Sequence, residues 1–289
     1  MAASEPKGQI KNQARLQPLS NPEQALTKTF KLLHSASDDW EKKIEGLTFL
    51  RVMAQNHMDI LMPKLHDICL AIINEVKNLR SAVSCAAMAT LGDMYVHLQR
   101  AMDSEVEVTA RVLLHKASEA NAFIRQGANS ALGHMVQSCT PTRVMNALLV
   151  GGLSHRNARS CTAQHLERLA EVMGTARLLS GKKDLTDRFL IAVSKLAVDP
   201  SQEVRHHGRN ILSNMATNGD FPKMWDKFAP RKERESLREV ISKVNLKESS
   251  AWNIQCHILG DVWGDIRDDH SNILWKGKKE DQDVNKCKP

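Results

Sequence analysis

Four stretches of the chain align with one another without a gap, and this internal repeat limits the possible folds more than any other feature. They are LRSAVSCAAMATLGDM from Leu79, ANAFIRQGANSALGHM from Ala120, SHRNARSCTAQHLERL from Ser154 and PSQEVRHHGRNILSNM from Pro200. The fifth, thirteenth and sixteenth positions are apolar in all four, and the ninth is always small or short. Because these positions lie three or four residues apart, they share one face of a helix. The small ninth residue predicts that a neighbouring helix packs closely there.

A second apolar-periodic stretch precedes each repeat, so the helices come in pairs. These stretches are the one with Leu61, Leu65, Ile68 and Ile72 on one face, VTARVLLHKA, RVMNALLVGGL and RFLIAVSKLAV. The opening residues follow the same plan, with a helix through EQALTKTFKLL, the turn HSASDD and a second helix from Trp40 to about Gln55. A sixth pair joins FPKMWDKFA, a short first helix, to RESLREVISKV.

Helix pairs that recur at roughly 40 residues are typical of HEAT-type solenoids. The sequence therefore predicts an all-α fold, an α-solenoid of about six HEAT-like pairs, in preference to an irregular helical bundle. Aromatic residues make up only 4% of the chain, which also favours helix over strand.

The turns inside the pairs should form one edge of this solenoid, and that edge carries basic residues. Trp40, Arg80, Arg125, Arg156 and Arg205 lie on or beside successive turns. The whole chain has a formal net charge of +7 at pH 7. A basic edge with an aromatic anchor favours an acidic partner.

The turns resemble those of the TOG domain, a paddle of six HEAT repeats that binds tubulin through the turns within its repeats. The resemblance rests on DDWEKKIEGL in the first turn, NLRSAV in the second, SHRNARS in the fourth and DPSQEVR in the fifth. It covers about Asn21 to Leu246 and is closest to the CLASP and crescerin branch of the family. It implies a non-enzymatic protein of the cytoplasm and cytoskeleton that binds tubulin or microtubules. The crescerin likeness further implies that it decorates or stabilises a lattice such as a ciliary or flagellar axoneme.

Carried over turn by turn, the resemblance implies a set of tubulin-binding residues. These are Trp40, Lys42, Lys43, Asn78, Arg80, Ser81, Arg125, Arg156, Asn157, Arg159 and Arg205. Some have a structural alternative. Trp40 could pack against Leu33, while Arg125 and Arg205 follow the apolar fifth position and could bond to a neighbouring turn. Asn121 and Asp199 are expected to cap helices.

Two other kinds of binding protein compete with this interpretation. A HEAT adaptor would bind another acidic protein or a peptide on the face of the solenoid, and a nucleic-acid binder would use the basic edge. The scarcity of aromatic residues and the moderate charge argue against nucleic acid. No apolar run approaches the roughly 20 residues that span a bilayer, and MAASEPKGQIKNQ has no apolar core, so we expect neither a membrane partner nor a signal peptide.

The sequence also gives no sign of an active site, a metal site or a cofactor site. SGKKD at Ser180 ends like a phosphate loop, but Ala176 and Lys183 occupy positions where that loop needs Gly and Ser or Thr. His206 and His207 have no second cluster of metal ligands nearby in sequence, and spacing alone does not pair His155 with Cys161 for catalysis. The six cysteines are scattered without a CxxC pair, so we expect buried thiols in a reducing compartment.

The two ends of the chain differ from the repeats between them. Residues 1–20 are polar and should be disordered, and residues 21–246 should form the HEAT domain. Residues 247–289 form a Trp-rich extension with a solvated tail, containing Trp252, Trp263 and Trp275. This extension could cap the last repeat, or its tryptophans could dock on another axonemal or microtubule-associated protein.

Overall fold

The structure, a computed structural model, describes residues 17–34, 39–153, 156–181 and 185–242. Within them every regular element is a helix, as the sequence predicts. The first helices of the pairs are α1 (Pro22–His34), α4 (Leu65–Val76), α6 (Val106–Lys116), α8 (Pro141–Gly151), α11 (Thr186–Ala197) and α13 (Phe221–Phe228). The second helices are α2 (Trp40–Asn56), α5 (Ser81–Leu98), α7 (Ala122–Ser138), α9 (Arg156–Met173), α12 (Gln202–Ala216) and the helical residues 231–242. These six pairs confirm the predicted solenoid.

Short helices join one pair to the next, and the sequence did not predict them. They are α3 (Met58–Leu61), the 3₁₀ turns η1 (Met62–Lys64) and η2 (Gln99–Ser104), and α10 (Thr175–Leu178). Gly174 separates α9 from α10 with a φ of 74°, a conformation that costs glycine little because it has no Cβ. These connections lie at the ends of the second helices.

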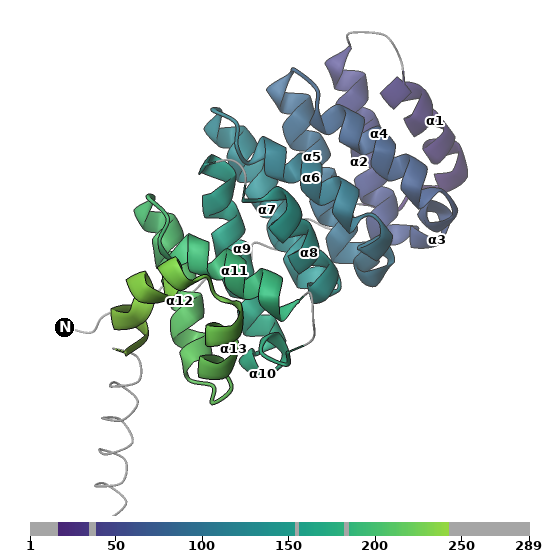
Figure 1. Cartoon of the computed structure of the whole chain (residues 1–289). Helices are drawn as coiled ribbons and strands as arrows, with labels where there is room; N and C mark the ends of the chain where they lie inside the picture. The colour runs from purple at the N-terminus through teal and green to yellow at the C-terminus, as the bar shows by residue number, and fades with distance from the viewer. Residues whose placement is uncertain (1–16, 35–38, 154–155, 182–184, 243–289) are drawn as a thin grey trace, which may run out of the picture. The chain divides into compact units, whose positions relative to one another are not determined.

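The pairs stack in chain order, and equivalent helices pack on one another (Figure 1). α2 packs on α5 and α5 on α7, while α6 packs between α4 and α8. The repeated apolar positions supply this packing: all four fifth, ninth, thirteenth and sixteenth residues are buried. Apolar burial between successive pairs therefore holds the solenoid together.

The small ninth residue lets the two helices of a pair approach closely, as predicted. A Cβ added to Gly208 in α12 would lie 2.5 Å from the backbone nitrogen of Ala197 in α11. The hydroxyl of Thr162, the ninth residue of its repeat, donates to the carbonyl of Gly152 at 3.1 Å. The expected buried thiols are confirmed for Cys69, Cys139 and Cys161, whereas Cys85 is partly exposed.

Candidate functional site

The second helices of pairs 1 to 5 all begin at the same position of the repeat. Ser81, Ala122, Arg156 and Gln202, the third residues of the aligned stretches, each open a helix, and Trp40 opens α2. These starts lie along one edge in Figure 1. We call this edge, made of residues 39–42, 77–81, 117–123, 156–157 and 198–202, the turn edge. Any side chain at the third position is thus presented at this edge.

Trp40 is exposed at the first residue of α2, with 38% of its surface accessible. Asp39 caps the helix by accepting from the backbone nitrogen of Lys42 at 3.4 Å. The Lys42 ammonium lies 2.9 Å from the same carboxylate. This hydrogen bond lowers the pKa of Asp39 and raises the pKa of Lys42. The first turn therefore presents an exposed indole and an ammonium that is paired with Asp39.

Lys43 has a structural role that the sequence did not reveal. Its ammonium lies 2.7 Å from the Glu75 carboxylate, and only 1% of the Glu75 side chain is exposed. Glu75 also accepts from the Asn78 side chain at 2.9 Å, and Asn78 in turn accepts from the backbone nitrogen of Arg80 at 2.9 Å. Lys43 and Asn78 thus shape the second turn instead of projecting from it. In the sequence, this role could have been read from Glu75, an acidic residue three positions before Asn78 in the turn.

Arg125 and Arg205 bond to the turns that precede them, as their structural alternative expects. Both occupy the sixth position of the repeat, and each donates Nη1 to two carbonyl oxygens of the preceding turn. Arg125 reaches Glu119 and Ala120 at 2.9 and 2.5 Å, and Arg205 reaches Asp199 and Pro200 at 2.7 and 2.8 Å. A charged donor satisfies carbonyls that a turn leaves without helical partners.

Arg159 occupies the same sixth position but pairs with the next repeat. Its Nε lies 2.7 Å from the carboxylate of Asp199, a buried residue in the fifth turn. Asp199 also accepts from the backbone nitrogen of Ser201 at 2.8 Å, so it stabilises the turn rather than capping the helix directly. Asn121 is the cap predicted for α7, since its side chain accepts from the Phe123 backbone nitrogen at 2.9 Å. Arg159 therefore ties two repeats together.

The remaining predicted residues lie on the surface of the turn edge. Arg80, Ser81, Arg156 and Asn157 are exposed. Asn157 also donates to the carbonyl of Ser118 at 3.2 Å, which links the fourth turn to the third. The structure thus brings Trp40, Lys42, Arg80, Ser81, Arg156 and Asn157 to one surface. Trp252, Trp263 and Trp275 lie outside the described residues.

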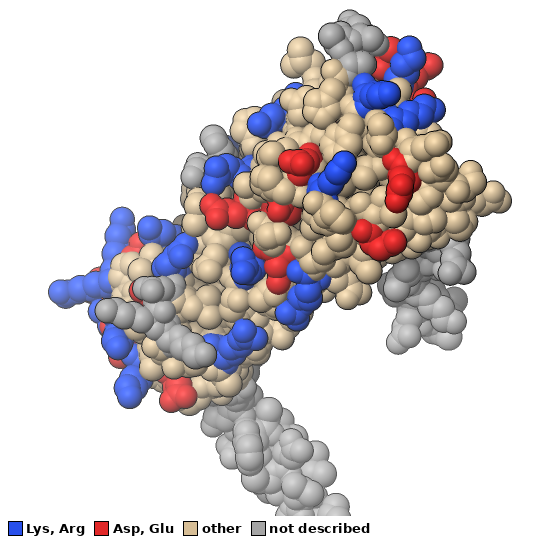
Figure 2. All heavy atoms as spheres, turned by 90° about the vertical axis from the view of Figure 1, so that its right-hand side faces the viewer, with Lys and Arg blue, Asp and Glu red and all other residues tan. Residues whose placement is uncertain are grey.

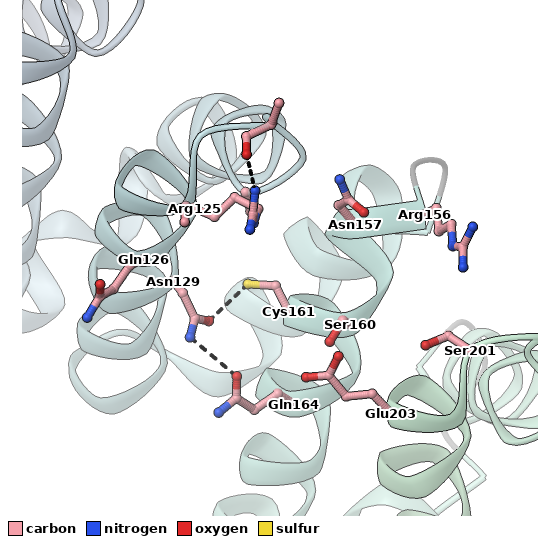
Figure 3. Close-up of a pocket in the computed structure, with 13 residues that line it drawn as sticks. Arg125, Gln126, Asn129, Arg156, Asn157, Ser160, Cys161, Gln164, Ser201 and Glu203 are labelled. Carbon is pink, nitrogen blue, oxygen red and sulfur yellow. Dashed lines mark hydrogen bonds between the residues drawn. The ribbon is translucent and has the colours of Figure 1, made fainter.

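A polar groove of about 800 Å³ runs between α7, α9 and the start of α12 (Figure 3). It brings Arg125, Arg156 and Asn157 together with Ser201 and Glu203. Deeper in the groove, the Asn129 carbonyl accepts from the Cys161 thiol at 3.1 Å, and its amide donates to Gln164 at 3.4 Å. Such a lining suits a polar chain or water better than an apolar ligand.

His165 lies behind this groove and is buried. Its Nε2 is 2.8 Å from the Asn129 side-chain oxygen, and burial lowers the pKa of His165 to about 4. The nearby Arg168 and His207 lower the pKa further. His165 is therefore neutral at pH 7 and donates from Nε2, which is a structural role.

Two kinds of site are absent from the described residues. They hold no group of three or more His, Cys, Asp or Glu side chains placed to bind a metal ion. None of their helices combines the length and the hydrophobicity needed to cross a bilayer.

Residues 23–239 match the family described as CLASP N terminal. This match covers most of the chain and all six helix pairs. The chain belongs to the CLASP N-terminal family.

The relatives include two proteins named TOG array regulator of axonemal microtubules protein 1. The mouse protein is 44% identical over 241 residues, and the human protein is 49% identical over 239 residues. Each alignment covers 83% of this chain but only 14% and 11% of the respective relative. The Crescerin-like protein che-12 of Caenorhabditis elegans is 27% identical over an alignment of 270 residues, and the alignment covers 84% of this chain and 21% of that protein. The resemblance to the crescerin branch is confirmed, and the chain spans a small part of each of these relatives.

Solved TOG domains share the fold. The TOG domain of Zyg9 from C. elegans has a TM-score of 0.58 at 16% identity, covering 80% of this chain and 90% of that chain. A structure from work on microtubule plus-end tracking by XMAP215, CLIP-170 and EB1 has a TM-score of 0.56 at 14% identity. The match covers 79% of this chain and 95% of that chain. This CLASP N-terminal family member therefore has the TOG arrangement of helix pairs.

Charge on the face seen in Figure 2 is mixed. Lys and Arg are most numerous over the lower end, where the last helix pairs lie, and Asp and Glu are interspersed with them higher up. This face has no continuous basic patch of the kind that follows a phosphate backbone.

Proposed function

We propose that this chain binds tubulin or microtubules, without catalysing a reaction, through its turn edge. The observation that carries the proposal is the exposed Trp40 on the same edge as the exposed Lys42, Arg80 and Arg156. Tubulin is strongly acidic, so the three basic side chains would steer and orient it, while Trp40 would bury apolar area at the contact. The names of the relatives, which refer to axonemal microtubules, support the same partner. One TOG structure with a TM-score of 0.55 comes from work on TOG-tubulin binding specificity.

The basic residues of the turn edge divide by role under this proposal. Arg156 and Lys42 contact the partner directly. Lys43, Arg125, Arg159 and Arg205 act indirectly, because their bonds to Glu75, to the turn carbonyls and to Asp199 hold the turns in shape. Replacing one of these four residues should lower the stability of the domain, and it should weaken binding only through that loss of turn structure.

The test is co-sedimentation with microtubules, run beside a gel-shift assay with nucleic acid at the same salt concentration. We expect microtubule binding that weakens as salt rises, with no shift of nucleic acid. Arg156→Glu should weaken microtubule binding strongly, whereas Arg177→Glu, the same charge change on exposed α10 outside the turn edge, should not. Equal binding by the two variants would contradict the proposal, as would preference for nucleic acid.

We also propose a cytoskeletal location, in particular a ciliary or flagellar axoneme, where the chain would decorate or stabilise the lattice. The support is the naming of the mouse and human relatives as regulators of axonemal microtubules. A tagged full-length chain expressed in ciliated cells should concentrate along the axoneme. Uniform cytoplasmic staining would contradict the axonemal location. Binding to the microtubule lattice itself is tested separately by co-sedimentation.

A HEAT adaptor is the second candidate, and the polar groove between α7 and α9 favours it. Arg156 and the amides of Gln126 and Gln164 could bind an acidic or extended peptide there. Gln164→Ala lies within the groove and outside the turn edge. Loss of binding in both Gln164→Ala and Arg156→Glu, with Trp40→Ala silent, would favour the adaptor.

The Trp-rich residues 247–289 supply a further part of the proposal, a contact with a second microtubule-associated protein or with the lattice. Truncation after Ser249 removes Trp252, Trp263 and Trp275. We expect the truncated chain to keep its melting temperature and to be retained less well on native microtubules. A lower melting temperature would instead support the capping role, and full retention with full stability would contradict both.

A further inference from the structure

Three consecutive helix pairs hold a large apolar side chain in solvent at the turn edge. Trp40 is 38% exposed in pair 1, Leu79 is 102% exposed in pair 2 and Phe123 is 76% exposed in pair 3. Single exposed apolar residues are common on protein surfaces. Three in successive turns of the same edge form a row, and a row of this kind is typical of an interaction surface.

The turns that carry Leu79 and Phe123 are firmly held. The Leu79 turn is fixed by the buried Glu75, which accepts from Asn78, and by the bond from the Arg80 nitrogen to Asn78. The Phe123 turn is fixed by Arg125, which donates to the two carbonyls before it, and by the Asn121 cap. A side chain on a fixed turn loses less conformational entropy when it binds than one on a mobile loop.

The charged side chains at the third turn, Lys116, Glu119 and Arg125, all bond within the domain. Glu119 lies 2.7 Å from the ammonium of the largely buried Lys116, so the two charges offset each other. Arg125 donates one guanidinium nitrogen, Nη1, to two turn carbonyls. Phe123 is the large side chain that this turn presents to solvent.

We propose that Leu79 and Phe123 are apolar anchors of the turn edge, which dock on an apolar patch of the acidic protein surface that the basic residues engage. The edge then has apolar anchors in pairs 1 to 3, where Lys42 and Arg80 also lie, and the exposed Arg156 in pair 4. This inference rests on the proposed function and adds its specificity: a polyphosphate or nucleic-acid backbone offers no apolar patch for Leu79 and Phe123. A tubulin-type surface, acidic but with apolar area between its carboxylates, suits both the apolar anchors and the basic residues.

The test measures microtubule affinity for Leu79→Ser and Phe123→Ser at low and at high salt. Each variant should bind about tenfold more weakly than the unchanged chain, as expected for an interface anchor. The loss should be the same at both salt concentrations, because an apolar contact is not screened, whereas the loss in Arg156→Glu should shrink as salt rises. Phe123→Leu, which keeps an apolar side chain, should recover most of the affinity.

Val172→Ser is the matched control, since Val172 is 61% exposed in the last turn of α9, away from the turn edge. Its affinity and the melting temperatures of all variants should match the unchanged chain. If the unchanged chain does not bind microtubules, the proposed function fails and the anchors fail with it. If it binds and the Leu79 and Phe123 variants bind equally well, the anchor proposal alone is overturned.

Discussion

At the scale of single residues, position within the repeat decides what a basic side chain does. The third position opens a helix and faces solvent, as Trp40 and Arg156 do. The sixth position lies one turn further in, next to the buried fifth. Its side chain bonds to a turn or to the next repeat, as Lys43 and Arg205 show.

Lys43→Ala should therefore destabilise the domain. The change leaves the buried Glu75 without its ion-pair partner, which costs about 3 kcal/mol. Urea unfolding of Lys43→Ala and Lys42→Ala, compared with the unchanged chain, measures this. Lys42→Ala should keep the unfolding midpoint, because Lys42 is exposed and its ion pair is on the surface. An equal loss in both variants would contradict the different roles of the two lysines.

His165 should make the stability depend on pH. Its pKa is about 4 in the folded chain, below the ordinary histidine value of 6.5 that applies to the unfolded chain. Between about pH 4 and pH 6.5 the unfolded chain therefore binds a proton that the folded chain does not. Stability is then complete above about pH 6.5 and falls as pH drops towards 4, by about 2 kcal/mol at pH 5. His165→Gln, which keeps a side-chain donor for Asn129, should lose this part of the dependence. Parallel stability curves for the two chains between about pH 7 and pH 5 would contradict it.

At the scale of elements, the repeat allowed all six helix pairs to be predicted, because burial at a fixed helical period dictates which face packs. Leu91, Leu132, Leu166 and Leu212, the thirteenth residues, are all buried as that period requires. The connecting elements η2 and α10 were missed, since short turns depend on local geometry such as the positive φ of Gly174. The pairs Lys43–Glu75 and Arg159–Asp199 were missed because they depend on the register between neighbouring repeats.

Gly208→Ala tests the close approach of α11 and α12. The added methyl group would meet the Ala197 backbone, which cannot move away as a flexible side chain could. We expect a loss of about 2 kcal/mol or more in unfolding free energy. Gly219→Ala adds a methyl group in open space and should leave stability nearly unchanged. A stable Gly208→Ala chain would show that the two helices can separate at little cost.

At the scale of the whole domain, repetition turns single positions into an edge. The residues at the start of each second helix become a row that spans successive pairs, and this row could be predicted once the repeat was aligned. Which side chains near this row face solvent could not be predicted from the sequence. Lys42 and Lys43, for example, are neighbours in sequence, but they lie on different sides of the helix. The exposed Leu79 and Phe123 lacked any charge or motif that would have singled them out.

The most direct test of the turn edge is the microtubule affinity of Trp40→Ala, measured beside its melting temperature. Met58→Ala is the control, because Met58 is 47% exposed at the start of α3, outside the turn edge. We predict that Trp40→Ala loses about 2 kcal/mol of binding free energy, close to thirtyfold in affinity, and melts like the unchanged chain. Unchanged affinity together with a clearly lower melting temperature would contradict this account and make Trp40 a packing residue of the first helix pair.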